Sequence, residues 1–200
     1  MLNQAFIFMG KSGSGKGTQA KLLRDYLGKN DGGRKVIYIE TGQLLRDFGK
    51  QYAGNYTAKL VNEVINEGKL MPAYMPIKLW TDCLINNYTG EEHIIFDGVA
   101  RRYHEAGILE GALQMYLKIK PHILDIVVSD DWATERLLGR GREDDNEDDI
   151  RERLAFYQSD VKESIEYFKK DESWFNYHAI NGEQTIEGVH DEIVGQIFNS

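Results

Sequence analysis

Short apolar runs recur along the chain and are separated by longer segments in which apolar residues have helical spacing. The runs cover residues 5–9, 36–39, 94–96, 123–128 and 178–180. Buried strands that alternate with helices form parallel sheets with right-handed crossovers and with helices on both faces. The pattern therefore predicts an α/β fold with three αβα layers around a five-stranded parallel sheet.

Two segments do not fit a simple strand-to-helix crossover. Residues 41–70 have helical spacing punctuated by glycines and are too long for one connection. Residues 139–146 form a short, highly charged stretch, after which apolar spacing predicts a helix to about Lys170. Asn146 could cap that helix. We expect a small helical insertion at about 41–70 and a short loop at about 139–146 within a single domain.

The first apolar run leads directly into a glycine-rich segment, Gly-Lys-Ser-Gly-Ser-Gly-Lys-Gly-Thr at residues 10–18. Glycines let successive backbone N–H groups point inward, and the following helix adds its positive end. The lysine of this spacing reaches the outer phosphates of a nucleotide. The segment therefore predicts a phosphate-binding loop (P-loop) for a nucleoside triphosphate, made by Gly13, Ser14, Gly15, Lys16, Gly17 and Thr18. A glycine-rich turn without a ligand is the alternative that this context disfavours.

Position 17 departs from the common P-loop pattern because it is glycine, where most such loops carry a Ser or Thr that touches magnesium. Asp97 follows the third apolar run, where an acid that orients Mg²⁺ or its waters is expected. A strand-end aspartate can otherwise be a helix cap or a turn residue. We expect Mg²⁺ as the cofactor, held through phosphates and water with Asp97 and without a direct protein ligand.

Composition narrows the function classes. The chain has 200 residues, 42% of them hydrophobic, which fits one compact domain. Its net charge of −8 argues against a general nucleic-acid binder. No stretch approaches the length of a membrane span, and the first residues lead straight into a strand without a signal segment. The single cysteine excludes an internal disulfide. These features predict a cytoplasmic protein without membrane partners.

Arginines are concentrated in one part of this acidic chain. Between residues 101 and 153 lie Arg101, Arg102, Arg136, Arg140, Arg142, Arg151 and Arg153. Planar, bidentate donors gathered in this way indicate phosphate binding. Ion pairs with nearby acids are the alternative, above all for Arg102 and Arg151.

Motifs over nearly the whole chain resemble the adenylate kinase family of nucleoside monophosphate kinases. The P-loop has the family variant Gly-Lys-Gly-Thr-Gln at residues 15–19, and Thr-Gly-Gln-Leu-Leu-Arg at 41–46 is similar to the monophosphate-binding segment. Residues 68–72 resemble the segment that closes that small domain. Asp-Gly-Val-Ala-Arg at 97–101 matches the family block Asp-Gly-Phe-Pro-Arg at three positions. Residues 135–153 resemble the lid region, and the turn at Asn181–Gly182 resembles the adenine contact.

The resemblance implies transfer of the γ-phosphoryl group of ATP to AMP, giving two ADP, with Mg²⁺ and without a covalent enzyme intermediate. It makes residues 41–70 the binding insertion for the nucleoside monophosphate (NMP) and residues 139–146 a short lid, and family precedent suggests a monomer. The implied catalytic residues are Lys16, Asp97, Arg101, Arg140, Arg142 and Arg153. ATP would contact the P-loop residues named above and Arg136, Arg140 and Gly182. The acceptor would contact Thr41, Gly42, Arg46, Lys69, Met71, Gly98, Arg101, Glu105, Arg142 and Arg153.

Glu105 is the departure that bears on the substrate. Adenylate kinases carry a glutamine here, which can donate to adenine N1 and accept from the adenine amino group, whereas a carboxylate can only accept. A carboxylate suits guanine, which offers two adjacent donors. AMP remains the expected acceptor on family grounds, and kinases for GMP or for UMP and CMP are the alternatives.

Other function classes lack the features that they would need. A small-metabolite kinase would not need the segments at 41–46 and 68–72. A GTPase switch would carry an Asn-Lys-x-Asp motif, which is absent from the sequence. A non-catalytic nucleotide-binding regulator stays open as an alternative, but it has little reason to combine Lys16, Asp97 and the arginine cluster.

Overall fold

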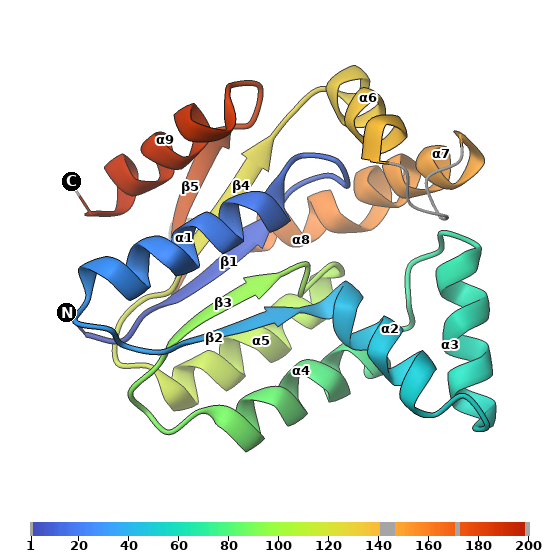
Figure 1. The fold of residues 1–200 in the computed structure, drawn as a ribbon, viewed down its shortest axis with the longest axis horizontal. Coiled ribbons are helices and arrows are strands. Elements are labelled where there is room, and N and C mark those ends of the chain that lie inside the picture. Colours follow the sequence, from blue (N-terminus) through green and yellow to red (C-terminus); the bar gives the residue numbers. More distant parts are fainter. Residues whose placement is uncertain (1, 141–146, 171–172, 199–200) are drawn as a thin grey trace.

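The computed structural model describes residues 2–140, 147–170 and 173–198. Its sheet contains β1 (Ala5–Met9), β2 (Val36–Glu40), β3 (His93–Asp97), β4 (His122–Val127) and β5 (Asn176–Asn181). All neighbouring strands are parallel, in the order β2-β3-β1-β4-β5 (Figure 1). The predicted αβα fold with a five-stranded parallel sheet is therefore confirmed.

Helices cover both faces of the sheet. Successive side chains of a strand point to opposite faces, and every residue of β1 is buried, so both of its faces are apolar and need to be covered. Phe6 and Phe8 pack toward α1 (Lys16–Asn30) and α9 (Ile186–Phe198). On the other face, Ile7 belongs to the core formed with α4 (Tyr74–Asn87), α5 (Tyr103–Tyr116) and α8 (Lys162–Phe168). Figure 1 shows these two layers on either side of the strands.

Two helices stand beside the sheet rather than on its faces. They are α2 (Thr41–Gln51) and α3 (Tyr56–Asn66), and Asn55 caps α3 by accepting a hydrogen bond from the Thr57 N–H at 2.7 Å. Leu45, Val61, Met71 and Met75 form a small apolar core of their own between these helices and the start of α4. The pair therefore has its own packing, apart from the two main cores.

The predicted long helix before β5 is interrupted. It consists of α7 (Glu147–Phe156), a π-helical turn (Tyr157–Val161) and α8, which ends at Phe168. Helix α6 (Asp130–Arg140) precedes it. Residues 139 and 140 end α6, whereas residues 141–146, with Asn146, lie outside the described residues. None of the helices in the described segments is long and apolar enough to cross a bilayer.

The turn after β3 is held in an uncommon backbone conformation. Ala100 has φ of 49° and is the one non-glycine residue with a positive φ in the described part of the chain. Its buried carbonyl accepts a hydrogen bond from Ser164 Oγ of α8 at 2.5 Å. Strained residues of this kind persist where the surrounding structure fixes them, often at functional sites. The turn carries Asp97 at its start and Arg101 at its end.

A histidine pair on β4 and β5 predicts acid sensitivity of the fold. His122 Nδ1 lies 3.0 Å from His178 Nε2, and Phe6 stacks on the His122 ring. Burial, with the charge of His178, lowers the pKa of His122 from its ordinary 6.5 to about 4. The unfolded chain therefore takes up this proton as pH falls below 6.5, before the folded chain does. The contribution of the neutral His122 ring to folding stability is therefore fully present above pH 6.5. As the pH falls to the folded pKa of about 4, up to about 3 kcal/mol of the free energy of unfolding is lost.

Denaturant unfolding between about pH 7 and pH 4 measures this loss. His122→Phe keeps a stacking ring but cannot titrate, so we expect a shallower decline in the free energy of unfolding. His104→Gln changes an exposed histidine and should keep the wild-type decline. Equal slopes for the His122 variant and the wild type would contradict the assignment.

Candidate active site

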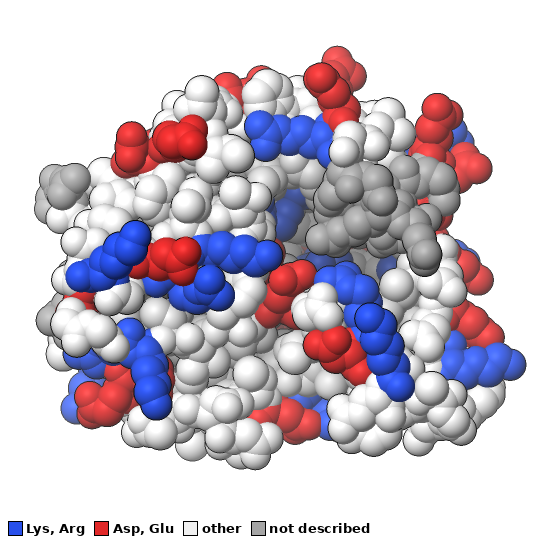
Figure 2. Space-filling view, in the orientation of Figure 1, with Lys and Arg blue, Asp and Glu red and all other residues white. Residues whose placement is uncertain are grey.

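A cleft of about 780 Å³ opens at the carboxyl ends of β1, β2 and β3. Parallel α/β sheets bind ligands at this edge. Figure 2 shows the hollow near the centre of one face, with Lys and Arg side chains gathered around it. The sequence-predicted site residues that line the cleft are Gly13, Gly15, Lys16, Gly17, Thr18, Thr41, Gly42, Arg46, Lys69, Met71, Asp97, Gly98, Arg101, Glu105, Arg136 and Arg153.

The remaining predicted residues are placed differently. Ser14 is buried beneath the loop, where its Oγ lies 3.4 Å from Lys16 Nζ. Gly182 does not line the cleft, and its N–H donates to the Val127 carbonyl at 2.9 Å. Arg142 and the side chain of Arg140 lie outside the described residues.

The P-loop is pressed tightly against α6. Gly13 has φ of 84°, and a Cβ atom there would lie 2.5 Å from the Ala133 carbonyl oxygen. Only glycine satisfies both the positive φ and this close approach. Lys16 begins α1, and its Nζ donates to the Gly10 carbonyl at 2.7 Å and to the Lys11 carbonyl. The lysine ammonium is thus held over the rim of the loop, beside the backbone that would cradle phosphates.

Asp97 stands close to the start of the P-loop helix. A Cβ atom on Gly17 would lie 3.1 Å from Asp97 Oδ2, so a larger residue here would require the carboxylate to shift by a few tenths of an ångström. Tyr38 Oη donates a hydrogen bond to the same Oδ2 at 3.2 Å. Burial and the negative charge of Asp97 raise the pKa of Tyr38, which keeps its donor proton. Sequence reasoning missed Tyr38, because only the pairing of β2 with β3 brings it to Asp97.

The donor groups at the P-loop are of the kind that Mg²⁺ uses. No group of three or more His, Cys, Asp or Glu side chains that could hold a metal occurs among the described residues. Mg²⁺ keeps several waters and commonly uses one or two carboxylates together with substrate phosphates. A lone strand-end carboxylate at the P-loop matches that donor set.

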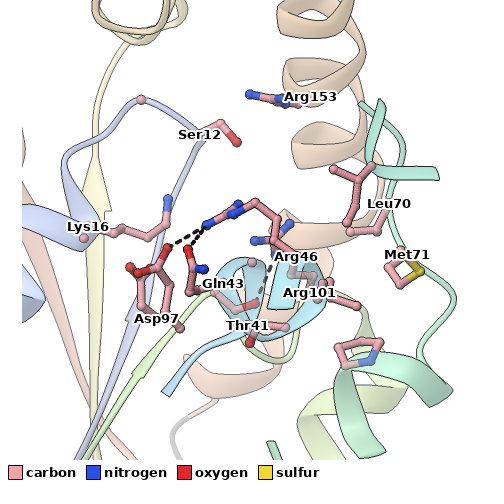
Figure 3. A pocket seen from close by; sticks show the side chains of 18 of the residues that line it. Ser12, Lys16, Thr41, Gln43, Arg46, Leu70, Met71, Asp97, Arg101 and Arg153 are labelled. Atoms are coloured by element: carbon pink, nitrogen blue, oxygen red, sulfur yellow. Dashed lines mark hydrogen bonds and ion pairs between the residues drawn. The ribbon is translucent and has the colours of Figure 1, made fainter. Parts of the chain in front are cut away.

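Three arginines from different elements share the cleft with Lys16. Figure 3 shows Arg46, Arg101 and Arg153 directed toward a common space that Lys16 faces from the P-loop side. Arg101 Nε donates to the Gly98 carbonyl at 3.0 Å, and Arg153 of α7 is buried. Burial, and then the charges of Arg153 and Arg46, lower the pKa of Arg101 despite two nearby carboxylates. Like charges held together in this way are suited to a multiply charged anion.

Arg46 is held by residues that the sequence reasoning did not assign to the site. Its Nη2 lies 3.2 Å from Glu40 Oε1 and 2.9 Å from Gln43 Oε1. Both partners line the cleft. Gln43 belongs to the segment at residues 41–46 but was given no role there, and Glu40 carried no motif signal.

The end of the cleft near α2 is apolar with isolated polar groups. Leu45, Met71 and Pro76 are buried and line it. Thr41 is 2% exposed, and its Oγ1 has no hydrogen-bond partner among the described residues. A buried hydroxyl without a partner is costly unless a ligand completes it. Glu105, also buried, lies at this end.

Other arginines have structural partners. Arg136 of α6 lines the cleft, and its guanidinium lies 4.8 Å from the ring centroid of Trp132. Arg151 pairs with Asp148 on the exposed face of α7, as the ion-pair alternative predicted. Arg102 donates to the Met71 carbonyl at 2.6 Å and lies 3.5 Å from Asp160.

Comparisons with known proteins agree with this geometry. The family model described as adenylate kinase matches residues 8–173. Adenylate kinase from Corynebacterium aurimucosum is 35% identical over 187 residues, covering 93% of this chain and 94% of the relative. Adenylate kinase 1 from Nostoc sp. is 32% identical, covering 94% and 95%, and the Bacteroides fragilis adenylate kinase is 30% identical, covering 96% of each chain. The chain belongs to the adenylate kinase family.

Proposed function

We propose that this chain transfers the γ-phosphoryl group of ATP to AMP and yields two ADP. The observation that carries the proposal is one cleft in which a P-loop lysine and three arginines from other elements face a common space. Phosphoryl transfer needs donor and acceptor oxygens in line and neutralisation of the charge between them. A cage of fixed cations between two nucleotide sites supplies both, which supports an enzyme rather than a nucleotide-binding regulator.

The donor side is the P-loop. Its backbone amides and Lys16 would hold the ATP phosphates. Arg136 would stack on the adenine of ATP, and the turn at Gly182 would contact the same base. Arg101, Arg140, Arg142 and Arg153 would surround the transferred group. The guanidinium of Arg136 already lies on an aromatic ring, which supports a stacking role.

The acceptor side is the α2–α3 segment with the turn after β3. Arg46 and Arg101 would bind the acceptor phosphate, and Thr41 Oγ1 would gain the hydrogen bond that it lacks. Gly42, Lys69, Met71, Gly98 and Glu105 complete the proposed contacts. The separate apolar core of α2 and α3 supports the proposal that residues 41–70 are an NMP-binding insertion that moves as a unit. With a short lid at 139–146, closure would exclude water from the transferred group.

Mg²⁺ is the proposed cofactor, and it would neutralise phosphate charge at the P-loop with Asp97 as its protein anchor. Replacing Asp97 with Asn keeps the shape and the hydrogen bond from Tyr38 but removes the negative charge. We expect a higher Mg²⁺ concentration for half-maximal rate and a lower maximal rate. A titration of initial rate against Mg²⁺ measures both. An unchanged titration curve would leave Asp97 with a structural role only.

A coupled assay of ADP formation, with and without acceptor, tests the function. We expect ATP consumption to depend on AMP and two ADP to form per ATP. A panel of AMP, GMP, CMP, UMP and dTMP identifies the acceptor, with GMP favoured as the alternative by the carboxylate of Glu105. Nucleotide binding without transfer to any acceptor would favour a regulator.

We further propose that the enzyme acts as a monomer in the cytoplasm on freely diffusing ATP and AMP. One chain by itself brings the P-loop lysine and three arginines together in one cleft, so this set of cations needs no residue from a second copy. Light scattering coupled to size-exclusion chromatography measures the assembly state.

A further inference from the structure

Glu105 is a buried acid at the apolar end of the cleft for which phosphoryl transfer itself has no use. It lies in the first turn of α5, is 4% exposed, and faces the cleft that Leu45, Met71 and Pro76 also line. Apolar side chains beside a buried polar group suit a nucleobase, whose faces are apolar and whose edge is polar. The acid is placed to meet that edge.

The carboxylate of Glu105 has hydrogen-bonding capacity left over. Its Oε2 accepts from the Arg101 backbone N–H at 2.9 Å. Its Oε1 lies 3.6 Å from Arg102 Nη1, beyond ordinary hydrogen-bond distance. Arg102 instead donates from Nη1 to the Met71 carbonyl and from Nη2 to the Leu70 carbonyl. Glu105 can therefore accept from a ligand without losing its existing bonds.

Adenine and a carboxylate do not match at this edge. Adenine offers one acceptor, N1, beside one donor, its amino group, whereas an ionised carboxylate is an acceptor only. Guanine offers two adjacent donors, which the ionised carboxylate can accept together. A proton between Glu105 and N1 resolves the mismatch for adenine, because the neutral acid donates through one oxygen and accepts through the other.

We propose that AMP binding takes up one proton from solvent, which bridges a Glu105 oxygen and adenine N1. The inference rests on the proposed function and makes Glu105 the residue that determines acceptor specificity. The ionised Glu105, one proton from solvent and AMP together form the complex, and the proton returns to solvent when AMP dissociates. GMP brings its own N1–H and needs no such uptake.

The surroundings of Glu105 permit protonation. Burial raises the pKa of its carboxyl, and the Arg101 backbone N–H, Arg102, the Arg101 guanidinium and His104 oppose that rise. Asp160 of the π-helical turn partly offsets the charge of Arg102. Among the residues facing Arg101, Arg46 comes from α2 and Arg153 from α7. A base that fills the slot removes remaining water and favours the neutral acid further.

The test compares the KM for AMP of the wild type and of Glu105→Gln across about pH 6 to 9. Taking the ratio of the two KM values at each pH cancels the titration of the AMP phosphate and of every other shared group. Above the pKa of Glu105 in the free enzyme, the ratio of wild type to variant should rise by about tenfold per pH unit. The KM for ATP, measured in the same way, should give a flat ratio. A flat ratio for AMP overturns the inference.

A direct measurement on the wild type makes the test independent of the variant. Calorimetric titration of AMP at pH 8, in two buffers of different ionisation enthalpy, gives the number of protons taken up. At that pH a phosphate monoester is already fully ionised, because its second pKa is about 6. We expect close to one proton per AMP for the wild type and none for GMP or for Glu105→Gln. Zero uptake with AMP on the wild type also overturns the inference.

Failure of the inference is distinguishable from failure of the proposed function. If no monophosphate accelerates ADP formation by the wild type at any pH, the function itself fails. If AMP accelerates it while the KM ratio stays flat and no proton is taken up, only the role of Glu105 fails. We also expect Glu105→Gln to lower the preference for GMP over AMP, measured as kcat/KM, by at least about tenfold.

Discussion

Arg101→Ala is expected to lower kcat by about a hundredfold or more while the protein stays folded. Arg101 ends the turn after β3 and is fixed by its bond to the Gly98 carbonyl, so its charge is positioned before substrates bind. A preorganised cation stabilises the charge of the transferred group at no reorganisation cost. Steady-state kinetics with saturating ATP and AMP measure the effect.

Stability should not fall with activity in this variant. The guanidinium of Arg101 is partly buried near Arg46 and Arg153, so its removal relieves repulsion between like charges. We expect an unchanged or higher Tm. Arg151→Ala, on the exposed face of α7 and paired only with Asp148 among the described residues, serves as the matched control with near-normal kcat. A kcat for Arg101→Ala close to that of the control would refute the assignment.

Lys16→Met is expected to reduce kcat by roughly a hundredfold or more with little change in the fold. Methionine has nearly the same length and is apolar, so the change removes the ammonium that lies over the P-loop rim. In the structure Nζ donates to the carbonyls of Gly10 and Lys11 and to the hydroxyl of Ser14. Nucleotide phosphates would replace these neutral oxygens as better partners for the charge.

Lys11→Met is the matched control for this variant. Lys11 belongs to the same loop but does not line the cleft. Its Nζ donates to the Val128 carbonyl at 2.8 Å and pairs with Asp130 at 2.6 Å. We expect it to change kcat by no more than about twofold, since a partly exposed ion pair contributes little. Equal losses for the two variants would mean that the loop structure, rather than the Lys16 charge, is what matters.

The strands and the site edge could be predicted because their signals are local. Each buried strand is a short apolar run in the sequence. A residue of different chemistry marks where the run ends, such as Gly10 after β1 and Asp97 at the end of β3. Parallel topology then brings those ends together without further information. The structure differs by only a few residues at the strand ends, for example at β5, which begins at Asn176 rather than near His178.

The residues that hold the site could not be predicted, because their partners are distant in sequence. Tyr38 meets Asp97 through the register of β2 and β3. Ser164 reaches Ala100 across 64 positions, and nothing in either local sequence marks the pair. Arg102 is a mixed case: it forms the ion pair with an acid that its charge suggested, with Asp160 at 3.5 Å, and it also donates to the backbone carbonyls of residues 70 and 71, which the sequence did not indicate.

The close approach of Gly17 and Asp97 couples two positions that are far apart in the sequence. A hydroxyl-bearing residue grafted at position 17 would bring its Cβ atom to 3.1 Å from the carboxylate. The carboxylate would have to give way by a few tenths of an ångström, and that shift would disturb the hydrogen bond that it accepts from Tyr38. A substitution in the loop would thus be felt on β2, two strands away from β1 in the sheet.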